Sequence, residues 1–321
     1  MISFRYHIVS IVSVFLALAV GVALGGGPLK GEVDNTLVDQ VESDRAVKAE
    51  LQEEIAALRA ANDFSDAFAD TIAPGLVGQI LRGRVVSLVV LPTATLSEVT
   101  ALTDMVVTAG GSVGGTVRIG SRMLDVGNKQ LVEELGDQLL DGAPELSVPP
   151  DASGYERIGA LLARAIGTDA DPGGAAVDGV AESILAGLST AELVSVDGDL
   201  NRRGSLVLFV AGPGSGTTEE RQATNSIATA LISAVDAGTA GSVVAGPIAS
   251  ARPGGVVWAI REDVAAAQAV STVDVLGRSA ARIVTVMALA GQGLDQTGQF
   301  GVVDAADGAM PGASVSGAGV G

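Results

Sequence analysis

The sequence predicts an α/β protein with an N-terminal transmembrane helix, a coiled-coil helix, and then a Rossmann-like, doubly wound and mostly parallel sheet domain. Three observations lead to this prediction. An uncharged run opens the chain, a heptad pattern follows it, and β-branched runs then alternate with helical stretches. We expect four parts: a membrane anchor or signal-like helix (1–29), a coiled-coil helix (30–75), an exported α/β domain (80–300) and a disordered Gly/Ala-rich tail (301–321).

The uncharged run covers 17 residues, from Ile8 to Leu24. As a helix it spans roughly 26 Å, which is short for a bilayer core of about 30 Å and long for a signal peptide. We predict that it is retained, although Ala23-Leu24-Gly25 leaves cleavage open. Arg5 precedes the run and acidic residues follow Lys30, so we expect a single-pass protein of the cell envelope with a cytosolic N-terminus and an exported C-terminal domain.

Small residues in this run are spaced by four, at Ala17, Gly21 and Gly25. Such spacing places them on one face of a helix and lets two membrane helices approach closely. This pattern favours a homodimer.

A heptad pattern follows the run and is interrupted at Asp44 and Lys48. It predicts a coiled-coil seam between two copies, with an asparagine at a position where a buried Asn fixes register. The alternative is a single amphipathic helix that lies on the following domain. The predicted seam consists of Leu37, Val41, Leu51, Ile55, Leu58 and Asn62.

The α/β domain begins with a β-branched run at 84–92, as in a buried parallel strand. Thr95 and Glu98 form a candidate capping box for a helix at 96–109, and a second strand follows at 112–119. Residues 129–193 read as mostly helical. Further strands are expected at 205–212, 241–248 and 255–260, and further helices at 218–237 and 276–289.

Composition excludes several functions. The chain has 37 acidic and 19 basic residues and a net charge of −18, which disfavours nucleic acid as a partner. It has no cysteine, so a hydrophobic core must hold an exported fold without disulfides. Its single histidine, His7, lies beside the membrane run, which rules out Ser-His or Cys-His catalysis in the exported domain. We therefore predict that the protein is not an enzyme.

One loop has the composition of a phosphate cradle, with glycines at Gly212, Gly214 and Gly216 between a strand and a helix. It lacks the lysine of a P-loop and fails the dinucleotide fingerprint. A turn capped by Thr217 or Thr218 is the simpler interpretation, and we predict no cofactor. Two carboxylate pairs in Gly- or Pro-flanked loops, Asp169/Asp171 and Asp197/Asp199, read as solvated loop residues, so we predict no metal site.

The opening "ISFRYHIVSIVSVFLALAVGVALGGGPL", the helix "VDQVESDRAVKAELQEEIAALR" and the C-terminal "GGVVWAIREDVAAAQAVSTVDVLGRSAARIVTVMALAGQGLDQTGQFG" resemble the actinobacterial family of the mycobacterial copper transport protein B. The resemblance covers nearly the whole chain. It implies an envelope protein of copper efflux or tolerance, described as an outer-membrane channel. It also implies a complex with a cytosolic or membrane partner that acts in daughter-cell separation.

The residues themselves support the two implied functions unequally. Copper(I) prefers thiolate, thioether and imidazole ligands, and the exported part offers only methionines, at Met105, Met123, Met287 and Met310. Copper is therefore expected from the resemblance alone. We place copper transport or homeostasis first, and a non-catalytic dimeric scaffold in a cell-separation complex as the alternative.

Overall fold

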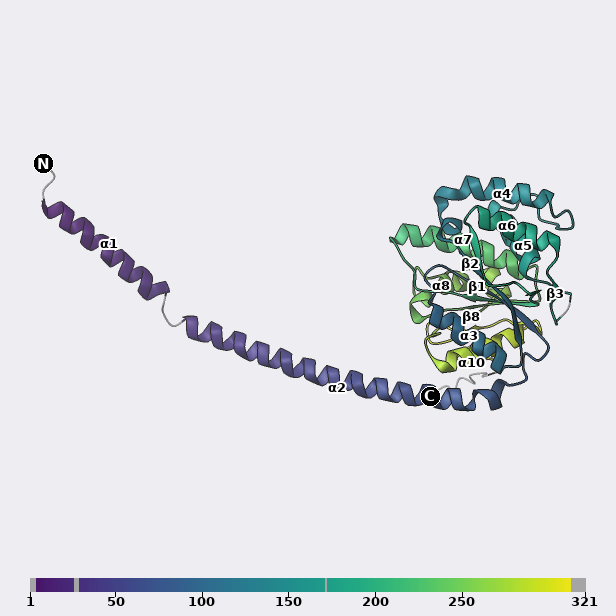
Figure 1. Ribbon diagram of the computed structural model, residues 1–321. Helices are drawn as coiled ribbons and strands as arrows, with labels where there is room; N and C mark the ends of the chain where they lie inside the picture. Colours follow the sequence, from purple (N-terminus) through teal and green to yellow (C-terminus); the bar gives the residue numbers. More distant parts are fainter. Residues whose placement is uncertain (1–3, 26–28, 171, 313–321) are drawn as a thin grey trace, which may run out of the picture. The chain divides into compact units, whose positions relative to one another are not determined.

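The computed structural model describes residues 4–25, 29–170 and 172–312, and for residues 29–38 the backbone alone (Figure 1). It divides into two units, Met1–Ser65 and Asp66–Gly321. The first unit contains α1 (Phe4–Gly25) and most of α2 (Leu29–Val77). Within the described residues, α1 alone is long and apolar enough to cross a membrane, with a mean hydropathy of 2.6 and no buried side chain.

The helix α2 has 49 residues and ends in the second unit, two residues beyond the predicted boundary. Its last turns pack on the domain through Ala69, Ala73 and Val77, which are almost fully buried. Pro74 stands inside these turns, and its carbonyl accepts a hydrogen bond from Gly78 N.

The second unit is a mixed α/β domain built on a seven-stranded sheet, in the order β4-β2-β1-β6-β7-β8-β9. Every neighbouring pair is parallel except β2 with β4. The strands are β1 (Val85–Val90), β2 (Ser112–Ile119), β4 (Val194–Asp197), β6 (Leu206–Val210), β7 (Ser242–Ala245), β8 (Ser271–Val273) and β9 (Gln299–Phe300); β3 (Ala175–Ala176) and β5 (Arg202–Arg203) form a separate pair.

Helices cover both faces of the sheet (Figure 1). One face packs against α3 (Leu96–Thr108), α10 (Ser279–Gln292) and the end of α2. The other packs against α4 (Lys129–Asp141), α5 (Gly154–Ile166), α6 (Gly179–Thr190), α7 (Thr218–Asp236), α8 (Val256–Glu262) and α9 (Val264–Ala269). The central strands β1 and β6 are buried along their whole length, which explains their continuous apolar sequences.

The first β-α-β unit is confirmed, and so is its capping box. The Thr95 side chain accepts a hydrogen bond from Glu98 N, and Glu98 Oε2 accepts one from Thr95 N at 3.0 Å. The helix at 218–237 also begins with a capping box, formed by Thr217 and Glu220.

The strand expected at 255–260 is wrong, because this stretch forms α8. Val257 and Ile260 are fully buried and lie three residues apart, on one face of a helix. A short apolar run does not distinguish a strand from a buried helix. The region expected to be mostly helical, 129–193, contains α4, α5 and α6 and, among its described residues, only the two-residue strand β3, and the antiparallel edge strand β4 begins directly after it.

The expected tail begins with residues that hydrogen-bond to the sheet. Gln299 N donates to Asp307 Oδ2 at 2.8 Å, and Gly301 N donates to Gly308 O at 3.0 Å. Residues 313–321, the rest of that tail, lie outside the described residues.

A buried ion pair fixes the segment after β9. Asp274 is fully buried and accepts hydrogen bonds from Arg261, Val302 N and Val303 N at 3.1, 2.8 and 3.0 Å. Arg261, whose side chain is 7% exposed, also donates to the carbonyls of Phe300 and Val303. One charge pair thus holds α8, β8 and the C-terminal segment together.

At the C-terminal end of α7, burial raises the pKa of Asp236 to about 6, and nearby Ser242 offsets this only in part. Its Oδ1 atom is buried without a hydrogen-bond partner. Because the folded pKa lies above the unfolded value near 3.8, the charged carboxyl destabilises the fold above pH 6, and this cost falls as the pH drops from 6 towards 4.

We therefore expect Asp236→Asn to raise the free energy of unfolding at pH 8 by roughly 1–3 kcal/mol. Urea titrations of both proteins at pH 8 and pH 5 should show this advantage shrinking at the lower pH. Asp141→Asn, at an exposed position, serves as the control. An Asp236→Asn variant that is less stable at pH 8, or whose advantage grows at pH 5, would contradict the argument.

Candidate functional site

A cavity of about 640 Å³ lies between β1 and β6, where the order in which strands are added to the sheet reverses. From β1 the chain proceeds outward to β2, and from β6 it proceeds the other way through β7 to β8. In open α/β sheets, ligands bind outside the carboxyl ends of the strands at such a switch point. The loops that follow β1 and β6 both line this cavity, so the fold places its candidate site here.

The glycine loop predicted from the sequence lies in this cavity, against the loop after β1. Thr93 Oγ1 donates a hydrogen bond to Pro213 O at 2.7 Å. Thr93 has a φ of 73°, a left-handed conformation that is strained for a β-branched residue. The two loops are therefore hydrogen-bonded to each other, although Thr93 and Pro213 are 120 residues apart in the sequence.

Packing accounts for the three glycines. A Cβ at Gly212 would lie 2.2 Å from the Thr93 carbonyl carbon, and a Cβ at Gly214 would lie 2.7 Å from Gly254 O. Gly216 has a φ of 87°, which favours glycine. The glycines are needed for close loop contacts, whether or not a ligand binds.

The N-terminus of α7 faces this cavity but carries its own anion. Glu220 Oε2 accepts a hydrogen bond from Thr217 N at 2.7 Å, and this contact holds the pKa of Glu220 below its usual range. Asp125 and Glu219 also line the cavity, while Arg221 donates to Gly216 O at 3.1 Å. This charge arrangement disfavours a phosphate and suits an uncharged or cationic polar ligand.

The sequence missed Thr93, Asp125 and Arg221 as members of this site. The rule that loops after neighbouring parallel strands meet at one edge of the sheet would have indicated Thr93. Nothing in the local sequence indicates Asp125, which is the N-cap of the short 3₁₀ helix Val126–Asn128.

The predicted dimer seam lies on α2 within the first unit. Val41, Leu51, Ile55 and Leu58 are 46–57% exposed in the single chain. The side chain of Leu37 lies outside the described residues, and Asn62 lies on the same helix. The seam stays a prediction, and its apolar residues are accessible to a second helix.

The predicted membrane contact lies on α1. Ala17, Gly21 and Gly25 are all exposed, and a Cβ at either glycine would have nothing within 4 Å. Close helix packing at this face stays a prediction.

Among the described residues, no group of three or more His, Asp or Glu side chains could hold a metal ion. Met123 lies in the core on one face of the sheet, and Met105 and Met287 lie on the other. Met310 is 40% exposed. Met105, Met123 and Met287 therefore pack as apolar side chains.

We expect Cu(I) titrated into the full-length protein, against a competing chelator, to find no site tighter than micromolar, because the soft ligands are dispersed. A nanomolar site would contradict this expectation. Met105→Leu and Met287→Leu, which share one core, would then test whether that core holds the ion, with Met123→Leu as the control.

A family model and known proteins match this chain along almost its whole length. The family model described as "Copper transport outer membrane protein, MctB" matches residues 1–311. The protein "Copper transporter MctB" of Mycobacterium tuberculosis (strain ATCC 25618 / H37Rv) is 28% identical over 292 residues, which are 90% of this chain and 92% of that protein. The protein of the same name from Mycobacterium leprae (strain TN) is 29% identical over 314 residues, 94% and 96% of the two chains.

Proposed function

Because the chain belongs to the family of the copper transport outer membrane protein MctB, we propose that it is a membrane-anchored cell-envelope protein that acts in copper transport or copper homeostasis. The observation that carries this proposal is the family match over residues 1–311, which includes α1, α2 and the α/β domain. The relatives named as copper transporters match over nearly their full length.

In this proposal α1 anchors the protein, with its N-terminus in the cytosol and the domain exported. Two observations support it: the mean hydropathy of α1, and the change from Arg5 before the apolar run to acidic residues after Lys30. The domain acts by binding a partner or ligand rather than by catalysis, because its helix-covered sheet offers cavities and lacks a histidine or cysteine.

The test is a strain that lacks the gene, complemented in two ways. One copy encodes the full chain, and the other replaces residues 1–29 by a cleavable signal peptide, so that the domain is exported without an anchor. We expect the deletion strain to accumulate copper, measured by mass spectrometry, and the full chain alone to restore the normal content. A deletion strain with unchanged copper content and copper tolerance would refute the proposed function.

A second candidate is a non-catalytic dimeric scaffold in an envelope complex for cell separation. The observation that favours it is the 49-residue α2, whose apolar residues Leu51, Ile55 and Leu58 are about half exposed in a single chain. The same deletion strain, grown without added copper, should then form chains of unseparated cells. Affinity purification of the full chain, with and without residues 32–70, should recover a division-associated partner with the intact protein only.

A further inference from the structure

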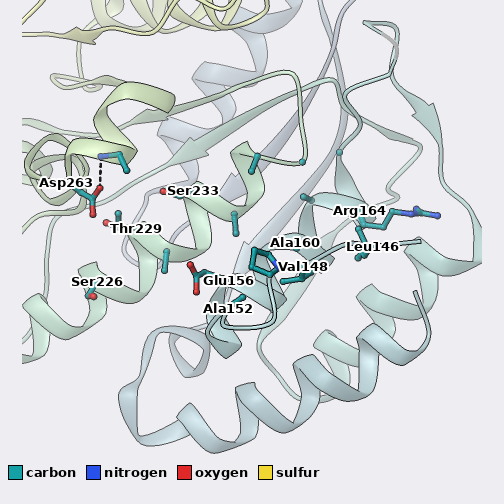
Figure 2. Close-up of a pocket in the computed structure, with 18 of the residues that line it drawn as sticks. Leu146, Val148, Ala152, Glu156, Ala160, Arg164, Ser226, Thr229, Ser233 and Asp263 are labelled. Carbon is teal, nitrogen blue, oxygen red and sulfur yellow. Dashed lines mark hydrogen bonds between the residues drawn. The ribbon is translucent and has the colours of Figure 1, made fainter. Parts of the chain in front are cut away.

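A second and larger cavity, of about 1270 Å³, runs along α7 on the face of the sheet that α5 and α8 also cover (Figure 2). We call it the α7 groove. Its lining follows α7 from Gln222 to Ala234, which is roughly 18 Å along a helix axis. Five or six residues of extended chain have that length. The volume exceeds the range of about 300–1,000 Å³ that is usual for small-molecule pockets.

Small side chains form the floor of the α7 groove. Ala160 comes from α5, and Ser226, Ala230 and Ser233 come from α7. Figure 2 shows Ala160, Ser226 and Ser233 around the cavity. With no bulky side chain on the floor, the main chain of a ligand can approach the helices closely.

Two buried polar atoms in the lining have no hydrogen-bond partner; Thr229 lines this groove alone, and Asn225 also borders the 640 Å³ cavity. Asn225 is 8% exposed and Thr229 is 9% exposed, and both Asn225 Nδ2 and Thr229 Oγ1 are unpaired. They stand one turn apart on α7, so they lie on the same face of the helix. Because buried polar groups are normally hydrogen-bonded, this pair indicates that a ligand completes the site.

The chemistry of the pair suits an extended main chain. Asn225 Nδ2 needs an acceptor, such as a carbonyl oxygen, and the Thr229 hydroxyl can donate or accept. An extended peptide offers free carbonyl and N–H groups at short intervals. The interior of a helix has none to offer, because its own backbone hydrogen bonds use them.

The charges around the α7 groove are mainly negative. Its two arginines are already paired: Arg164 with Glu145 and Asp178, at 2.8 Å each, and Arg203 with Asp178 at 3.6 Å. The acidic residues of the lining are Glu145, Asp151, Glu156, Asp169, Glu262 and Asp263. A basic occupant would therefore be attracted.

We propose that the α7 groove binds an extended, basic segment of a partner protein, about six residues long, whose main chain pairs with Asn225 and Thr229. Its basic side chains lie along the acidic rim. This inference does not depend on a role in copper transport, and its failure would leave that proposal unaffected.

The groove contains its own reporter, because Trp258 lines it and is the only tryptophan of the chain. The probe is an acetylated and amidated hexapeptide of alternating lysine and alanine, added to the full-length protein in detergent micelles. We expect a saturable change in Trp258 fluorescence, with one peptide bound per chain by calorimetry and weaker binding at higher salt. The same peptide with glutamate in place of lysine should not bind.

Two further probes identify what is recognised. Spermidine carries the same three charges without amide groups, and we expect it to bind at least about ten-fold more weakly. Equal binding of spermidine would overturn the proposal in favour of a cation site. A stapled helical peptide of the same composition that binds more tightly would overturn the extended conformation. The absence of any binding up to about 1 mM peptide would overturn the proposal altogether.

Thr229→Val separates binding from folding. It removes an unpaired buried hydroxyl, so the melting temperature should stay the same or rise, while peptide affinity should fall by about five-fold, the equivalent of one hydrogen bond. Thr190→Val, at an exposed position on α6, should leave the affinity unchanged. An unchanged affinity in Thr229→Val would show that the hydroxyl does not pair with the ligand and would refute the assigned contact.

Discussion

Replacing Asp274 by alanine is expected to lower the free energy of unfolding by roughly 3–5 kcal/mol. The substitution leaves the buried guanidinium of Arg261 without its carboxylate and the N–H groups of Val302 and Val303 without their acceptor. A domain is typically stable by about 5–15 kcal/mol, so this loss is a large share. Urea denaturation followed by circular dichroism provides the measurement.

The neighbouring Glu262 offers a matched control. It is an exposed acidic residue that follows Arg261 on α8, so Glu262→Ala should change stability by less than about 0.5 kcal/mol. A double variant, Arg261→Met with Asp274→Ala, should recover part of the loss because it removes the unpaired buried charge. If Asp274→Ala and Glu262→Ala unfold at the same urea concentration, the ion pair does not hold the C-terminal segment.

The substitution Ile55→Asp is expected to convert a dimeric α2 into a monomer. In a paired seam, Leu51, Ile55 and Leu58 would each contribute roughly 1.5–3 kcal/mol through burial. A carboxylate at the centre of this seam would be buried without a partner, at a cost of several kcal/mol unless the helices separate. The interruptions at Asp44 and Lys48 leave little stability in reserve.

The test uses a soluble fragment of residues 30–312, which keeps the segment that Asp274 holds. Sedimentation gives the oligomeric state, and circular dichroism checks that the domain, with its separate core, stays folded. Ala56→Asp makes the same charge change at the next position, away from the predicted seam, and should leave the dimer intact. A wild-type fragment that is monomeric at tens of micromolar would refute the seam and leave a single amphipathic helix as the interpretation of α2.

The elements that could be predicted are those with a complete signal in their own short stretch of sequence. The Thr95–Glu98 capping box, the apolar run of β1 and the helix after Thr217 are each recognisable within about ten residues. The strand β8 has three residues and α8 has seven, so neither is long enough to show a period. Their structure is decided by the tertiary contacts of Val257, Ile260 and Arg261.

The residues of the candidate sites were harder still to predict from the sequence, because tertiary structure brings them together. The glycine loop could be found from its composition, but its partner Thr93 lies 120 residues away. The α7 groove has no sequence signature, because Asn225 and Thr229 look like ordinary polar residues of an amphipathic helix. Only the neighbours that leave them buried and unpaired distinguish them.

The position of β1 at the centre of the sheet has a consequence for biosynthesis. Val86 pairs with Leu206, so the first strand to leave the ribosome obtains its central partner only after 120 more residues have followed. Sheets closed by such distant pairings fold slowly, and until β6 is made, the edge of the uncharged strand VVSLVV that pairs with β6 stays unpaired and prone to aggregate. If the domain is exported in an unfolded state, it completes its sheet on the far side of the membrane. Its yield then depends on protection of β1 during that interval.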